Sequence, residues 1–234
     1  PKRARGLISF SKKNNHNINY IYEFIDLAKQ HKSNVVLVAN MLTGDKQDII
    51  SMISLMRENN LNVVGVELGS ELSNKTYFDK GYTIDEYLYS AKELSKYIKS
   101  VFPAIKTAIV AAPIVESKEH RHSVWNKCLS KNNFYDAIIV HSYAKVVKGK
   151  DKYGQMIFEE NEGNPEVSFL NYKNRISSFF NKLYPLEIST YNSIFKNIPI
   201  WITEWNLQYS KKTGNTLLQS LFVANYFLEI LSNK

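Results

Sequence analysis

The stretch VVGVELGSELS, residues 63 to 73, decides the fold. It begins as an apolar run rich in valine, which indicates a buried β-strand, and it ends in a Gly-Ser turn. Glu67 and Glu71 lie four positions apart where the run meets the turn. Carboxylates at this point belong either to a surface turn or to a functional site at the end of a buried strand, and the flanking sequence decides between the two.

Outward from this stretch, short runs rich in β-branched residues alternate with longer segments whose apolar residues recur at helical spacing. The run NVVLVAN, residues 34–40, is of the kind that is buried on both faces of a sheet. Each strand is followed by a helix, which is the pattern of a parallel sheet built from βα units. We predict strands at 34–40, 62–68, 106–113, 136–144 and 198–206, and helices at 20–31, 45–60, 83–101, 122–131, 168–195 with a break near Pro185, and 213–232.

Two helix starts carry capping signals, and one long connection is predicted to be a loop. Asp45 is placed to cap the helix that follows it, and Thr83 with Glu86 three residues later forms a capping-box pattern. Residues 145–166 contain Gly, Asp, Asn and Pro and are expected to form a loop.

Two architectures fit repeated βα units, a closed barrel and an open doubly wound sheet. No glycine-rich phosphate-binding motif follows any strand, which argues against a nucleotide-binding open sheet. Polar residues instead gather at the predicted carboxyl ends of the strands, where catalytic groups collect in a (β/α)8 barrel. The sequence therefore predicts an α/β fold of the (β/α)8 TIM-barrel class. These polar residues are Asn40, Glu71, His141, Tyr143 and Glu204.

Glu204 follows the apolar run IPIWIT and lies between Trp201 and Trp205. Aromatic rings beside a carboxylate suit a sugar, because they pack against its C–H face. In a barrel, Glu71 and Glu204 would extend from strands on opposite sides of the mouth. Two facing carboxylates are the minimal equipment for glycoside hydrolysis, and a separation of about 5 to 5.5 Å gives retention of configuration.

Four stretches of the chain resemble clan A glycoside hydrolases. VELGSEL resembles the strand-four motif E-L/I-G-N-E, and HSY at 141–143 is similar to the His-x-Tyr of strand six. WITEWN resembles the D-E-W-N of strand seven in α-L-arabinofuranosidases. FIDLAKQHKSNVVLVANMLTG resembles the helix and third strand of arabinofuranosidase- and heparanase-like members. Together the resemblance covers residues 20–230.

The resemblance implies a retaining glycoside hydrolase that cleaves a polysaccharide or oligosaccharide by double displacement. Glu71 matches the acid/base and Glu204 the nucleophile. Glu67 matches the first glutamate of the motif, which we interpret as a structural acid inside the barrel. Substrate-binding positions are implied at Asn40, Ser70, His141, Tyr143, Trp201 and Trp205, with Tyr143 bonded to the nucleophile.

Ser70 departs from the family pattern, because the clan normally has Asn directly before the acid/base. That Asn bonds the sugar 2-hydroxyl, a contact that strengthens in the transition state. Serine is shorter, so three outcomes stay open. The substrate differs at this position, a water fills the gap, or activity is reduced or lost.

The resemblance also implies which strands of the barrel are present, and by this numbering the barrel is incomplete. The five predicted strands correspond to barrel strands three to seven. Residues 1–19 have room for one short strand at most, RGLISF at 5–10, and no clear eighth strand follows Glu204. A full barrel takes about 250 residues. We therefore expect residues 1–234 to be a single incomplete barrel domain, a fragment whose partners include other parts of the same longer chain.

Charge and composition limit the classes of partner that the protein is expected to bind. The formal net charge of +8 favours an acidic partner, but no nucleic-acid-binding motif is present. The lysine-rich stretch KVVKGKDK, residues 145–152, would follow strand six on the catalytic rim and favours an acidic glycan. The longest apolar stretch is far short of a membrane span. The predicted partner is thus a glycan, with no nucleic acid and no membrane span.

No metal or cofactor is expected. Cys128 is the single cysteine, so neither a disulfide within the chain nor a cysteine metal site can form. The histidines show no zinc spacing, and HRH at 120–122 is read as a solvated helix start.

Localisation follows only from the substrate class. The basic residues PKRAR at 1–5 are not followed by the apolar region of a signal peptide. Polysaccharide degradation nevertheless implies a secreted or cell-surface protein.

Two alternatives remain. One is a non-catalytic carbohydrate-binding or scaffold domain on the same barrel, since fold does not determine function. The other is an open-sheet protein in which both glutamates are structural.

Overall fold

The structure is a computed structural model that describes residues 20–114, 119–147, 149–150, 156–157, 164–196, 198–208 and 210–232. The predicted strand at 5–10 and residues 148, 151 and 152 of the lysine-rich stretch lie outside these residues. The chain divides into two compact units, Pro1–Ser70 with Asp85–Ile109, and Glu71–Ile84 with Val110–Lys234. The prediction of a single domain stays a prediction, and each unit is described by itself.

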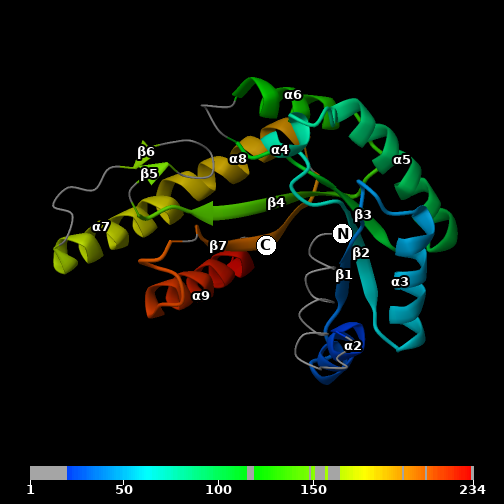
Figure 1. The fold of residues 1–234 in the computed structure, drawn as a ribbon, viewed down its shortest axis with the longest axis horizontal. Helices are drawn as coiled ribbons and strands as arrows, with labels where there is room; N and C mark the ends of the chain where they lie inside the picture. The colour runs from blue at the N-terminus through cyan, green and yellow to red at the C-terminus, as the bar shows by residue number, and fades with distance from the viewer. Residues whose placement is uncertain are drawn as a thin grey trace. The chain divides into compact units, whose positions relative to one another are not determined.

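The first unit is built from three parallel strands that are neighbours in chain order, β1 to β2 to β3. Helices α3 and α5 lie along the same face of these strands (Figure 1). The predicted strands and helices are confirmed here to within three residues at each end. The elements are α2 (Tyr20–Gln30), β1 (Val35–Val38), α3 (Lys46–Glu58), β2 (Val63–Leu68), α5 (Ile84–Val101) and β3 (Lys106–Val110).

Helix α3 begins as predicted from its cap. The Asp45 carboxylate accepts a hydrogen bond from the Gln47 amide at 3.0 Å. In return, the Asp45 amide donates to Asp48 Oδ2 at 2.9 Å, which completes a capping box. The two bonds satisfy amides that would otherwise lack partners at the helix start.

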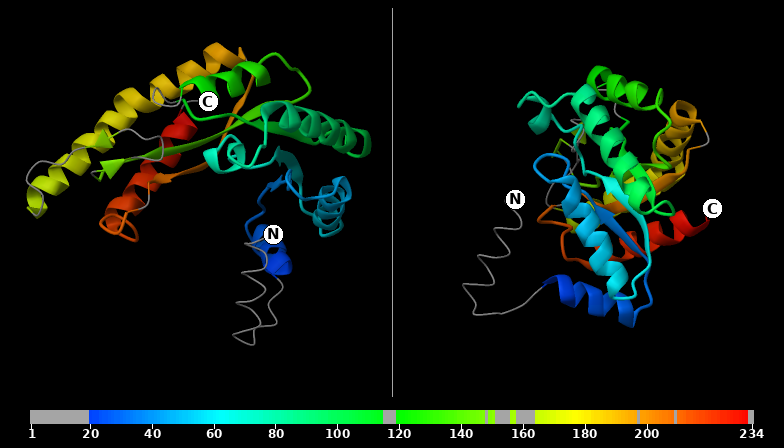
Figure 2. Two further views of the ribbon diagram at one scale, coloured as in Figure 1. Left: turned by 45° about the horizontal axis from the view of Figure 1, so that its top comes forward. Right: turned by 90° about the vertical axis from the view of Figure 1, so that its right-hand side faces the viewer.

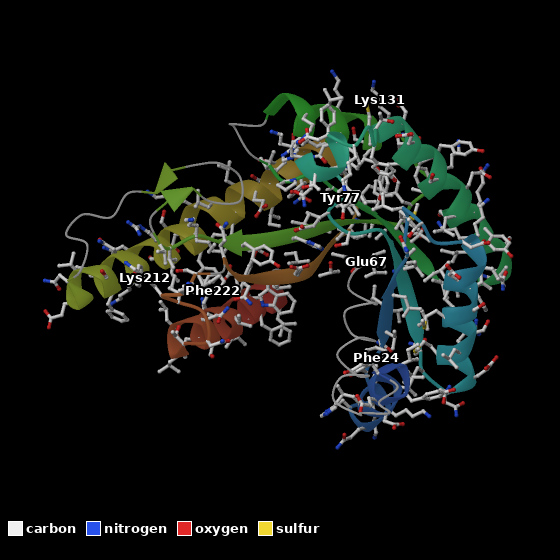
Figure 3. The ribbon with its side chains drawn as sticks, viewed as in Figure 1. Phe24, Glu67, Tyr77, Lys131, Lys212 and Phe222 are labelled. Carbon is white, nitrogen blue, oxygen red and sulfur yellow. The ribbon has the colours of Figure 1, made fainter. Side chains whose placement is uncertain are left out.

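The expectation that β1 is buried on both faces is wrong. Val35 is buried, but Val36 and Val38 are 39% and 54% exposed. Because side chains alternate along a strand, Val36 and Val38 share one face of β1, and this face is partly exposed. Phe24 of α2, labelled in Figure 3, is exposed as well. A cavity of about 690 Å³ opens among α2, the end of β1 and α3.

The second unit contains two parallel strands, β4 and β7, and the remaining helices. The chain enters it at the end of β3, where the Ala111 amide donates to Ile139 O of β4 at 3.1 Å. The elements are α4 (Lys75–Phe78), α6 (Glu119–Leu129), β4 (Ala137–Ala144), β5 (Gly149–Lys150), β6 (Met156–Ile157), α7 (Pro165–Ser178), η2 (Phe179–Leu183), α8 (Tyr184–Phe195), β7 (Ile200–Leu207) and α9 (Leu217–Ser232).

Two sequence expectations need correction in this unit. The helix predicted to break near Pro185 continues through a five-residue π-helical turn, η2, and Pro185 directly follows this turn in the first turn of α8. Figure 2 shows α7, η2 and α8 as one unbroken rod coloured yellow to orange. Within the predicted loop 145–166, β5 and β6 pair antiparallel.

Aromatic rings form the core of the second unit. Phe179 of η2 lies 6.1 Å from Tyr184, 5.7 Å from Phe222 and 5.3 Å from Tyr226, measured between ring centroids. Ala144 of β4 and Leu207 of β7 belong to the same buried cluster. The cluster thus packs the α7–α8 rod and α9 against one face of β4 and β7, and Figure 3 labels Phe222 at this position.

Buried tyrosines make this unit sensitive to alkali. Burial raises the pKa of Tyr135 to about 12 and that of Tyr184 to about 12, from 10.0, with Glu229 and Glu187 adding to the effect at Tyr184. Because the folded-state pKa lies above the unfolded one, the stability that these neutral phenols provide is present below about pH 10 and is lost as the pH rises toward 12. We expect the melting temperature to fall across this window, measured alongside the tyrosinate absorbance. Tyrosines that all ionised near pH 10 without loss of structure would contradict this.

None of the described helices is both long and apolar enough to cross a membrane.

Candidate active site

The pairing of β4 with β7 brings two predicted site residues side by side. His141 is the register partner of Glu204, and Tyr143 is the partner of Asn206 two residues further along. Partners in neighbouring parallel strands extend from the same face, and residues two apart share that face. His141, Tyr143 and Glu204 therefore stand on one face of the strand pair.

A β-bulge turns Glu204 toward this face. Val140 pairs with Ile202 and the next residue, His141, pairs with Glu204, so Thr203 has no partner in β4. If Thr203 were instead paired with His141 in a regular ladder, Glu204 would share the face of Ile202, which packs into the aromatic core. The bulge thus moves the carboxylate from the helix-covered face to the face of His141.

The two tryptophans lie on opposite faces. Trp201 pairs with Ile139, which places it on the face of His141. Trp205 pairs with Ser142 on the helix-covered face, where its indole N–H donates to Val223 O at 3.3 Å and its ring stacks on Phe227. The structure brings Trp201 to the face of the site and does not bring Trp205 there.

Glu71 lies in the turn after β2, within the second unit. Its φ of +51° is in the left-handed region, which costs about 1–2 kcal/mol for a residue other than glycine. The Asn74 amide donates to Glu71 O at 3.0 Å, and α4 begins directly afterwards. A strained backbone held by a following turn is a common feature of functional positions.

One imidazole nitrogen joins the two predicted catalytic carboxylates. His141 Nδ1 lies 3.3 Å from Glu71 Oε1 and 3.4 Å from Glu204 Oε2. The two carboxylate oxygens are therefore at most 6.7 Å apart, the sum of these distances.

Exposure differs sharply among these three side chains. The His141 side chain is 9% exposed, whereas those of Glu71 and Glu204 are 43% and 51% exposed. The buried imidazole is thus held by the protein, and both carboxylates remain accessible to a ligand.

A cavity of about 140 Å³ adjoins Glu71 and His141, and its wall includes residues that the sequence did not single out. His122, read as part of a solvated helix start, is only 5% exposed, and Arg121 Nη2 lies 3.0 Å from its Nε2. The Tyr191 hydroxyl donates to Ala112 O at 3.0 Å, and burial raises the pKa of Tyr191.

Asn74 also lines this cavity, and its Nδ2 donates to Glu71 Oε2 at 3.0 Å. Its sequence position, three residues after the predicted acid, is the one signal that could have drawn attention to it.

The remaining predicted site residues belong to the first unit. Asn40 is exposed, and its Oδ1 accepts from the Leu42 and Thr43 amides at 3.2 Å each, so that it shapes the turn after β1. Ser70 is exposed, and Glu67 is 5% exposed in β2. Their roles remain predictions. Over the described ranges, no three His, Cys, Asp or Glu side chains are close enough together to hold a metal ion.

No protein-family model matches the chain, and no curated protein matches it either.

Solved structures of α-L-arabinofuranosidases, however, are similar to it. A family 51 α-L-arabinofuranosidase from Bifidobacterium longum is 12% identical over 83% of this chain and 40% of that one, with a TM-score of 0.54. The Thermotoga maritima α-L-arabinofuranosidase, solved in complex with arabinose, is 19% identical over 80% and 37%, with a TM-score of 0.54. A third arabinofuranosidase is 20% identical over 80% and 37%, with a TM-score of 0.53.

The likeness shows the fold and confirms the predicted class, an incomplete (β/α)8 barrel. More particularly, the fold is the one seen in family 51 α-L-arabinofuranosidases of the glycoside hydrolases. This chain spans about two fifths of the length of those enzymes.

Proposed function

We propose that the protein is a retaining glycoside hydrolase, with Glu71 as acid/base and Glu204 as nucleophile. The observation that carries the proposal is the shared contact of both carboxylates with His141 Nδ1, at 3.3 and 3.4 Å. It limits the oxygen separation to at most 6.7 Å, which accommodates the roughly 5–5.5 Å between carboxyl groups of retaining enzymes.

The reaction proceeds in two displacements. Glu204 attacks the anomeric carbon while Glu71 gives its proton to the departing glycosidic oxygen, so the C–O bond to the leaving group breaks as the glycosyl ester forms. Glu71, now a carboxylate, takes a proton from water, which attacks the same carbon and releases Glu204. His141 holds both carboxylates at their mutual distance and orients them for these steps.

We propose an α-L-arabinofuranoside as the first glycone to test, because the similar solved structures are arabinofuranosidases. The net charge of +8 supports an acidic polysaccharide as the carrier of that sugar. Polysaccharide degradation of this kind places the protein outside the cell or at its surface. We further propose that other parts of a longer chain supply the remaining barrel strands.

Glu71→Ala tests the acid/base role. In the full-length protein, we expect it to slow cleavage of methyl α-L-arabinofuranoside by about 10²–10⁴-fold, because the methoxide leaving group needs a proton. Cleavage of the 4-nitrophenyl glycoside should be slowed less, because nitrophenolate leaves without being protonated. Azide should restore turnover of the nitrophenyl substrate and give a glycosyl azide of retained configuration, identified by NMR.

Glu93→Ala, a change of a partly exposed glutamate on α5, is the matched control and should leave both rates unchanged. Equal losses on both substrates with no azide product would contradict the assignment of Glu71. Glycan binding without any product from the wild-type protein would instead favour the non-catalytic alternative.

A further inference from the structure

We propose that the cavity of about 140 Å³ beside Glu71 is the subsite that receives the leaving group of the glycoside, and that Asn74 sets its specificity. The inference rests on the proposed function and extends it to residues outside the family motif. Its central observation is the position of Asn74, which both lines the cavity and bonds the predicted acid.

The occupant follows from which carboxylate borders the cavity. Glu71 and His141 line it, whereas Glu204 does not. The anomeric carbon must lie within reach of the nucleophile, and the leaving oxygen must lie within reach of the acid. Of the two catalytic carboxylates, only Glu71 borders this cavity. A group bound in the cavity is therefore the part of the substrate beyond the scissile oxygen.

The size and lining of the cavity suit one sugar ring. Typical ligand pockets measure roughly 300–1,000 Å³, so a cavity of about 140 Å³ takes one unit of a longer substrate. Pro113 and Ile139 provide apolar wall, and Ser73, Asn74 and His122 provide polar groups. A pyranose or furanose ring presents both an apolar C–H face and a rim of hydroxyl groups.

Asn74 has the features of a functional amide rather than of a helix cap. It occupies the N-cap position of α4, where asparagine commonly bonds the backbone, yet its side chain makes no capping bond. Its Nδ2 donates instead to Glu71 Oε2 at 3.0 Å. Within the described residues this side chain makes no second hydrogen bond, so its carbonyl oxygen and second N–H are available to a sugar hydroxyl.

This assignment gives the chain an amide beside the acid despite Ser70. The family motif places that amide directly before the acid, on the side of the sugar that forms the intermediate. Here the amide comes three residues after Glu71 and lines the cavity that Glu204 does not reach. The amide that hydrogen-bonds the glycone in the family motif is therefore replaced here by an amide that hydrogen-bonds the leaving group.

The test compares two substrates with alkoxide leaving groups, methyl α-L-arabinofuranoside and α-1,5-L-arabinobiose. Both need a proton from the acid, and only the disaccharide fills the cavity. The measured quantity is the ratio of kcat/KM for the disaccharide to kcat/KM for the methyl glycoside, in the full-length protein. Loss of the hydrogen bond between Asn74 and Glu71 slows cleavage of both substrates, whereas loss of the subsite slows only cleavage of the disaccharide and so lowers the ratio.

We expect Asn74→Ala to lower this ratio about five- to tenfold, the value of one hydrogen bond to the sugar. Ala111→Val, which adds two methyl groups at a buried position of the cavity wall, should lower the ratio about tenfold. The matched control is Asn181→Ala, because Asn181 is exposed, makes one side-chain bond to Ser177 and does not line the cavity. Its ratio should equal that of the wild type.

An unchanged ratio in both Asn74→Ala and Ala111→Val would overturn the inference and leave the proposed hydrolase intact. A wild-type protein that cleaves neither substrate would overturn the proposed function and the inference with it. Melting temperatures of all variants show whether a lost rate reflects lost folding, in which case Asn74→Ser, which keeps a polar group, decides the ratio.

Discussion

Glu204→Gln will abolish turnover and leave the protein folded. The amide has the size of the carboxylate but cannot form the glycosyl ester, so the rate should fall by about 10⁴-fold or more. The side chain is 51% exposed, and substitutions of accessible side chains usually change stability by less than about 0.5 kcal/mol. Hydrolysis of 4-nitrophenyl α-L-arabinofuranoside and the melting temperature are measured on the same preparation of the full-length protein.

Glu166→Gln provides the matched control, because Glu166 is an exposed glutamate in the first turn of α7. It should retain full activity. Full activity in Glu204→Gln would show that the nucleophile lies elsewhere or that the chemistry is different. A lost rate accompanied by a lowered melting temperature would point to misfolding instead.

Phe179→Ala should lower the free energy of unfolding of the second unit by about 3–5 kcal/mol, the usual cost of removing a buried phenyl ring. Phe179 is 5% exposed and packs against the rings of Phe180, Tyr184, Phe222 and Tyr226. The loss should appear as a lower midpoint in urea unfolding followed by circular dichroism.

Phe169→Ala is the control for this prediction, because that ring lies on α7 and is 59% exposed. It should change the free energy of unfolding by less than about 0.5 kcal/mol. Similar midpoints for the two variants would mean that the aromatic cluster is not the core that stabilises the unit.

The strands and most helices were predictable because their signals are local. Continuous β-branched runs and helical spacing mark each element in its own sequence, and Asp45 marks a helix start by its own side chain. The exposed face of β1 was not predictable, because a valine run looks the same whether or not another element covers it. The π-helical turn before Pro185 likewise carries no sequence signal that we can identify.

The candidate site was predictable in part. Glu71, His141 and Glu204 were all singled out, and the structure brings them together. Asn74 was missed, because nothing local distinguishes an asparagine that bonds a nearby carboxylate from one in an ordinary turn. Trp205 was assigned to the sugar because it neighbours Glu204, but adjacent residues in a strand point to opposite faces.

The unpaired Thr203 means that the face occupied by Glu204 is set by the pairing register of β7 rather than by the identity of its residues. If Thr203 entered the ladder opposite His141, Glu204 would move opposite Ser142, and its carboxylate would enter the aromatic core. The indole of Trp205 would then lie on the face of His141. A slip of one residue in the pairing would therefore remove the carboxylate from the site without any substitution, a change that a comparison scored by residue identity alone would not detect.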